Sequence, residues 1–186
     1  MSMNIYGAKQ LANSFRTVRK NTIQIAEDIP ESRYGFVPAE GTRSVAQTLV
    51  HIATLTSVWQ DIHGRKRLTD LDSYDFLAVF SELEEQEKKK RTKAEILDLL
   101  RTEGEKFAAF LESLSGETLA QEIREPAGGP AKSRLEALLS AKEHEMHHRG
   151  QLMLVERMLG IVPHLTKKYA EMEREYRESR QPQTAA

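Results

Sequence analysis

The sequence predicts an all-α protein, a four-helix bundle in which a long connection joins the second and third helices. Apolar residues recur at spacings of three and four along four long segments, which places them on one face of a helix. Three of these segments begin with Ser or Thr followed three residues later by Gln or Glu, a pattern that caps helix N-termini. No segment shows a convincing β-strand pattern.

The first helix is expected over residues 6–29, where Pro30 ends it because proline cannot continue a helix. The second helix is expected over residues 44–64, from a capping pair of Ser44 and Gln47 to a glycine. Both segments carry the apolar spacing of a bundle seam. They therefore predict the first two helices of the bundle.

The connection that follows is expected to contain a loop and then a helical segment around residues 70–80, before a solvated charge run over residues 82–91. The third long helix begins at Thr92, which is capped with Glu95, and is expected to stop at Gly116. The length of this connection argues against a simple bundle with short loops throughout.

Residues 125–132 are rich in glycine and proline and predict a plain loop. The fourth helix follows, from a capping pair of Ser133 and Glu136 to Leu159, with Gly160 as its C-terminal cap. A short polar helix is expected after residue 164. The chain is expected to form a single domain over residues 1–180, with a frayed tail over 181–186.

Composition excludes several classes of function. The 186 residues carry a net charge of -1, so no basic surface for nucleic acid is expected. There is no cysteine, which excludes disulfides, thiolate metal sites and cysteine nucleophiles. Residues 1–19 lack the apolar core of a signal peptide, and no apolar run has the length of a membrane span. We expect a cytoplasmic protein without membrane or nucleic-acid partners.

Two histidines, His144 and His148, dominate the functional interpretation. They lie four residues apart in the fourth helix, on the same stripe as Leu152 and Val155, so both are expected to face the core. Burying two unpartnered imidazoles costs on the order of a few kcal/mol, which a metal would offset. His51 lies at the edge of the apolar face of the second helix. The alternatives are that His144 and His148 are partly exposed helix histidines and that His51 is a core histidine bonded to a carbonyl.

Glu145 and His147 flank this pair at about 80° to either side. Both are candidates to contact the ligands from outside. The alternatives are an ion pair of Glu145 with Arg149 at the surface and a solvated His147. Gly150 within the same helix predicts close packing of another helix, because glycine is unfavourable there relative to alanine.

These residues resemble the DinB/YfiT-type family of metal-dependent enzymes, from the first helix to the end of the fourth. The resemblance rests on two short motifs, Leu49-Val50-His51-Ile52-Ala53 and His144-x-x-His147-His148-Arg149-Gly150-Gln151-Leu152.

The resemblance implies a four-helix bundle with a long crossover, frequent homodimers, and a divalent metal, zinc or nickel, held by His51, His144 and His148. It also implies thiol-dependent S-transferase or isomerase relatives, hence a small-molecule substrate and a low-molecular-weight thiol as cosubstrate. A three-histidine metal would activate a thiol or a water, so transferase and hydrolase chemistry both stay open. The candidate walls of the substrate pocket are Trp59, Tyr34 and Phe36.

Two other functions compete with this one. Residues 144–148 also spell H-E-x-x-H, the zincin protease motif, in which Glu145 would be the general base. Against a protease, Gln151 stands where the extended motif of one zincin branch has glycine, and no strand is predicted to hold a peptide. The other alternative is a non-catalytic binding bundle. No catalytic residue is assigned from the sequence.

Overall fold

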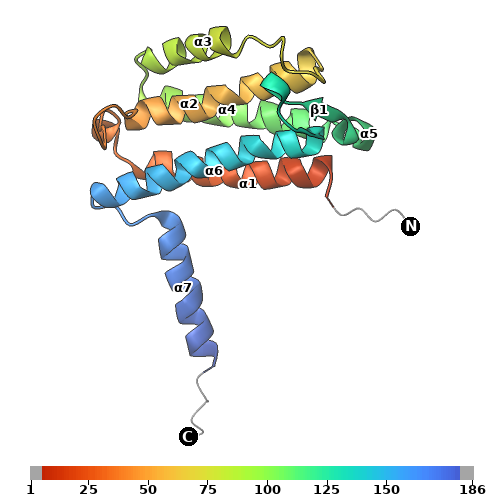
Figure 1. Ribbon diagram of the computed structural model, residues 1–186. Coiled ribbons are helices and arrows are strands. Elements are labelled where there is room, and N and C mark those ends of the chain that lie inside the picture. The colour runs from red at the N-terminus through yellow and green to blue at the C-terminus, as the bar shows by residue number, and fades with distance from the viewer. Residues whose placement is uncertain (1–5, 181–186) are drawn as a thin grey trace, which may run out of the picture.

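Four long helices form the bundle of this computed structural model, which describes residues 6–180. They are α1 (Ala8–Asp28), α2 (Val45–Gln60), α4 (Lys93–Glu112) and α6 (Arg134–Met158), and they lie side by side in Figure 1. Ser44 and Thr92 cap α2 and α4 in reciprocal capping boxes, as expected. The all-α bundle predicted from the sequence is therefore confirmed. The tail predicted over residues 181–186 lies outside the described residues.

The long connection between α2 and α4 contains a further helix, α3 (Phe76–Lys88), which lies along the outer side of α2 (Figure 1). One stripe of α3 carries side chains at spacings of four, three and four: Phe76, Phe80, Leu83 and Glu87. Leu83 and Glu87 on this stripe are buried. The expectation of a solvated charge run over residues 82–91 is therefore wrong at Leu83 and Glu87. Packing of α3 on α2 brings the carboxylate of Glu87 against α2.

A buried ion pair joins the helices at the middle of the bundle. Arg19 of α1 donates to both carboxylate oxygens of Glu145 on α6, at 2.9 and 3.1 Å from Nε and 3.0 Å from Nη2. It also donates to the carbonyls of Leu100 and Ile52. Gly104 of α4 makes room for this arginine, because a Cβ there would lie 2.8 Å from its Cγ.

Three expectations for local structure are wrong. The segment after α4 forms a short helix, α5 (Gly116–Ala120), so Gly116 begins a helix. The predicted plain loop belongs to a small antiparallel hairpin of β1 (Glu122–Arg124) and β2 (Ala131–Ser133). Strands of three residues are too short to show an alternating pattern. Gly150 has no atom outside its own stretch of helix within 4 Å of a Cβ position, so no helix of this chain packs there.

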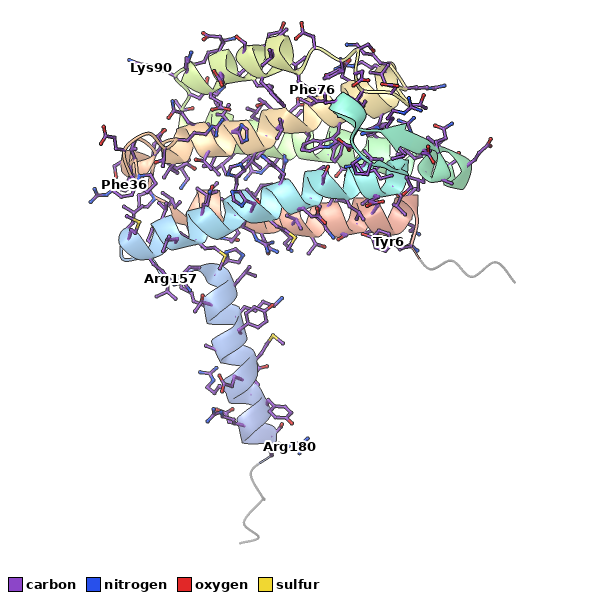
Figure 2. All side chains as sticks on the ribbon, in the orientation of Figure 1. Tyr6, Phe36, Phe76, Lys90, Arg157 and Arg180 are labelled. Carbon is purple, nitrogen blue, oxygen red and sulfur yellow. The ribbon has the colours of Figure 1, made fainter. Side chains whose placement is uncertain are left out.

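The last helix, α7 (His164–Ser179), leaves the bundle and extends away from it (Figure 1). None of its residues is buried, and Figure 2 shows side chains standing free around it as far as Arg180. The polar helix predicted after residue 164 is confirmed. No helix within residues 6–180 combines the length and the apolar character needed to cross a membrane.

Candidate metal centre

The three predicted histidines converge between α2 and α6. His144 Nε2 lies 3.1 Å from Nε2 of His51 and 3.1 Å from Nε2 of His148. One ring nitrogen of each histidine lies within 4.8 Å of those of the other two. The helix repeat places His144 and His148 on one face, and the packing of α2 on α6 supplies His51. The sequence-based expectation that these side chains meet is thus correct.

The outer nitrogens of two of these rings are held by oxygen atoms. His51 Nδ1 lies 2.7 Å from Glu87 Oε1, and His148 Nδ1 lies 2.7 Å from Gln151 Oε1. Because a carboxylate oxygen and an amide oxygen accept hydrogen bonds, each Nδ1 carries the proton. The tautomers assigned by these contacts leave the Nε2 lone pairs of both rings directed at His144.

Burial keeps these imidazoles neutral. It lowers the pKa of His144 to about 3 and that of His148 to about 4, with smaller contributions from the neighbouring histidines. Burial likewise lowers the pKa of His51, against the opposing effect of Glu87. Neutral imidazole is the form that binds metals, so the cluster holds its ligand form well below neutral pH.

The donor set fits a divalent transition metal. Two bonds of about 2.0–2.1 Å at a tetrahedral angle separate their nitrogens by about 3.3 Å, close to the spacing between neighbouring Nε2 atoms here. Among residues 6–180, no other group of three or more His, Asp or Glu side chains converges in this way. Three protein donors with room for a fourth ligand are typical of a catalytic site rather than a structural one.

Two cavities reach the cluster from different sides. The first has a volume of about 500 Å³, contacts His51 and His144, and is mostly apolar; its apolar walls are Leu55, Val58, Trp59, Ile62, Leu71, Phe76, Phe80 and Leu83. The second has a volume of about 670 Å³ and contacts His148, with more polar walls that include Gln47, Thr48 and Gln151. Arg43 and Glu87, which form a 2.6 Å ion pair, line both cavities.

Comparison with known proteins decides the family. Residues 14–152 match the DinB superfamily. The chain belongs to the DinB superfamily. The resemblance seen in the histidine motifs is therefore confirmed.

This DinB protein is similar to YjoA of Bacillus subtilis, an uncharacterized protein, with 29% identity over 154 residues, 82% of this chain and 91% of the relative. The crystal structure of YjoA, described as DinB-like, matches with a TM-score of 0.60 and 27% identity over 81% of this chain and 92% of that one. The likeness therefore extends over nearly all of YjoA.

Two more distant structures share the fold alone. YfiT from B. subtilis, described as a probable metal-dependent hydrolase with an unusual four-helix bundle topology, matches with a TM-score of 0.65 and 17% identity over 83% of this chain and 88% of its own. A mycothiol-dependent maleylpyruvate isomerase matches with a TM-score of 0.62 and 12% identity over 82% of this chain and 63% of its own. The DinB bundle thus occurs with more than one described activity.

Glu145 has a different place from the one its sequence suggests. It is buried in the ion pair with Arg19 and also accepts a 2.7 Å hydrogen bond from Thr22 Oγ1. Among residues 6–180, its ion-pair and hydrogen-bond partners are Arg19 and Thr22, so it pairs neither with Arg149 nor with a ring of the histidine cluster. A carboxylate held in this way cannot serve as the general base of a zincin, and the protease interpretation loses its catalytic group.

His147 packs edge-on against the ring of His148, with ring centroids 5.0 Å apart, and forms no hydrogen bond to a histidine of the cluster. Its ring is exposed, and its Nε2 lies 3.1 Å from Gln151 Nε2, the amide nitrogen of the side chain that holds His148. Among the expected pocket walls, Trp59 lines the apolar cavity. Tyr34 and Phe36 pack instead with the core between α1, α2 and α4. That part of the expectation is wrong.

Glu87 and Gln151, the two residues that orient the histidines, were not predicted from the sequence. A signal for Glu87 exists, because it continues the stripe of Phe76, Phe80 and Leu83 at helical spacing. The surrounding charge run concealed it. Gln151 follows His148 by three residues, on the same face of the helix, which is the spacing that allows the two side chains to meet.

Proposed function

We propose that this DinB protein is a metal-dependent enzyme in which His51, His144 and His148 hold a divalent ion, zinc or nickel. The observation that carries the proposal is the convergence of three neutral imidazoles beside an apolar cavity, with two of the rings oriented from outside by Glu87 and Gln151. The description of YfiT as metal-dependent supports it at the level of the fold.

The ion would supply a Lewis acid that lowers the pKa of a thiol or a water, so that either is a nucleophile near neutral pH. The protein's own residues contribute position. Glu87 and Gln151 fix the two imidazole rings, and contacts of this kind typically tune metal sites strongly. Because the chain has no cysteine, a thiol would have to come from a low-molecular-weight cosubstrate.

The two cavities favour thiol transfer over hydrolysis. A water molecule needs no cavity of its own, whereas the polar space beside His148 has the volume of a small organic cosubstrate. The mostly apolar cavity beside His51 and His144 suits the apolar body of an electrophilic small molecule. We therefore infer S-transfer to an apolar small molecule as the first reaction to test, with hydrolysis as the second.

Metal analysis of untagged protein tests the first step. We expect close to one zinc or nickel ion per chain after exposure to either metal, and loss of that ion in His148→Ala. His164→Ala is the matched control, because His164 is a partly buried histidine at the start of α7 and should leave the metal content unchanged. A His148→Ala variant that keeps its ion would contradict the proposed ligand set.

Activity then separates the functions. The metal-loaded protein is assayed with chlorodinitrobenzene and cysteine or glutathione, where thiol displaces chloride, and with a nitrophenyl ester in the absence of thiol. Metal-dependent turnover of the first alone supports a transferase, and turnover of the second alone supports a hydrolase. A protein that binds metal but turns over neither substrate across a wider panel would support a binding module.

A further inference from the structure

The helix α7 carries an apolar stripe that the described chain leaves largely uncovered beyond its first residue. Leu165, Tyr169, Met172 and Tyr176 follow one another at spacings of four, three and four, and the last three are 65%, 52% and 59% exposed. This is the spacing of a seam between two packed helices. A helix of this length with no packed face is marginally stable in water, so the stripe calls for a partner helix.

A second uncovered stripe runs along the outer side of α6. Met146, Leu154 and Met158 are 42%, 61% and 52% exposed, and they lie at intervals of four or eight residues. Gly150 falls on the same line, between Met146 and Leu154, and leaves a notch, since nothing lies within 4 Å of a Cβ position there. A large ring can enter such a notch, and the exposed stripe of α7 offers two tyrosine rings, those of Tyr169 and Tyr176.

The two stripes cannot cover each other within one chain, because α7 extends away from α6 (Figure 1). We propose that they cover each other between two copies: α7 of each protomer lies on the outer stripe of α6 of the other. In a two-fold dimer such a contact occurs twice, with the roles exchanged. A pairing of α7 with α7 alone would leave the α6 stripe exposed.

The charges beside the stripes match this arrangement. Arg149 and Arg157 lie alongside the α6 stripe, and neither forms an ion pair with any residue in the range 6–180. Glu175 lies on one side of the α7 stripe, and Glu173, which pairs with Arg177 of its own helix at 2.6 Å, lies on the other. An α7 helix on α6 of a second copy therefore brings carboxylates to unpaired guanidinium groups, which favours the encounter and fixes its register.

The dimer would also complete a wall of the functional site. Leu154 and Met158 line the cavity of about 670 Å³ that contacts His148. A partner helix on these two residues would therefore border that cavity. The dimer contact stands on exposure and charge alone and does not depend on the proposed chemistry.

Cross-linking tests the arrangement cleanly, because the protein has no cysteine of its own. Tagged variants with one cysteine at Met146, Leu154 or Met158 are mixed with untagged variants carrying one at Tyr169, Met172 or Tyr176. After exchange and mild oxidation, we expect a tagged–untagged disulfide dimer from at least one of these pairings. Arg174→Cys, on the opposite face of α7, is the matched control and should form at least tenfold less mixed dimer.

Three results would overturn the proposal. They are a monomer mass for the wild type by light scattering at micromolar concentration, no mixed disulfide in any pairing, or disulfides between two α7 cysteines in place of mixed ones.

Substitution gives an independent measurement. Tyr169→Glu with Met172→Glu should weaken dimerisation by about 100-fold, the effect of losing two buried anchors. The melting temperature of the bundle under dilute, monomeric conditions should not change, since α7 has no buried residue within its own chain. Lys167→Gln with Arg174→Gln makes the same change in net charge on the opposite face and should leave the dimer intact. Equal weakening by both pairs would overturn the proposal.

Discussion

The buried ion pair and the histidine cluster meet at adjacent residues of α6, Glu145 and His144, and are built in opposite ways. In the ion pair, both oxygens of Glu145 accept hydrogen bonds, and Arg19 and Thr22 donate them at 2.7–3.1 Å. In the cluster, the hydrogen-bond partners lie on the outer nitrogens, and the inner nitrogens face one another.

The difference distinguishes a group that stabilises the fold, the Arg19–Glu145 pair, from a group with free ligand atoms, the histidine cluster. A neutral imidazole has one N–H, so His144 can donate to His51 or to His148 but not to both. At least one buried lone pair of the cluster is therefore unmatched, which is unfavourable until a cation accepts it. The Arg19–Glu145 pair needs nothing further. Each of the following predictions tests one side of this contrast.

The largest effect is expected from breaking the ion pair. Arg19→Ala leaves Glu145 as an unpartnered buried charge and should lower the free energy of unfolding by about 3–5 kcal/mol. Arg16→Ala is the matched control on the same helix, because it removes surface pairs with Glu105 and Glu112 that are each worth about 0–1 kcal/mol. Urea denaturation measures both. If the two variants lost equal stability, the ion pair would not be what holds α1 to α6.

On the side of the cluster, Glu87→Gln should reduce metal affinity by about 10–100-fold, because the amide still meets His51 Nδ1 but without the negative charge. Competition with a chromophoric chelator measures the affinity. Glu84→Gln is the control, since Glu84 lines the same cavities from the same helix without contacting a histidine. An equal loss in both variants would show that only the net charge of α3 matters.

The metal-free protein should lose stability as the pH falls from about 6.5 towards 5. The pKa of His144 is lowered to about 3 and that of His148 to about 4 in the folded state. In this pH range the unfolded chain therefore binds protons that the folded protein does not, which favours unfolding.

The buried carboxyl of Glu156 acts in the opposite direction, because burial raises its pKa to about 7. The measurement is therefore best made in a Glu156→Gln background. Adding His144→Ala and His148→Ala should flatten the dependence of the unfolding free energy on pH. An unchanged slope would mean that the cluster is not neutral in the fold.

The smallest effect is expected at His147, which is exposed and touches the cluster only at the edge of the His148 ring and through Gln151. His147→Ala should reduce metal affinity by about tenfold or less, and Gln151→Ala, which also frees His148 Nδ1, should reduce it more. The same chelator competition ranks the two variants. Loss of the metal in His147→Ala with retention in His148→Ala would reverse the assignment of ligands on α6.

Much of the fold and most of the histidine cluster were predictable from local spacing. The period of the helix sets which residues share a face, so the buried stripe of α6 and the inward direction of His144 and His148 follow from the sequence. Capping pairs at Ser44 and Thr92 likewise predicted where α2 and α4 begin. Such features depend on residues within one or two turns of each other.

What the sequence by itself determined was therefore the set of helices and the faces they bury, together with the three histidines. The tertiary structure alone decided which groups those faces meet. Glu145 pairs with an arginine 126 positions away, Glu87 reaches His51 only because α3 folds back on α2, and α7 leaves the bundle. The physical reason is that a helix fixes the direction of a side chain locally, whereas its partner comes from a distant segment whose packing is set by the whole core.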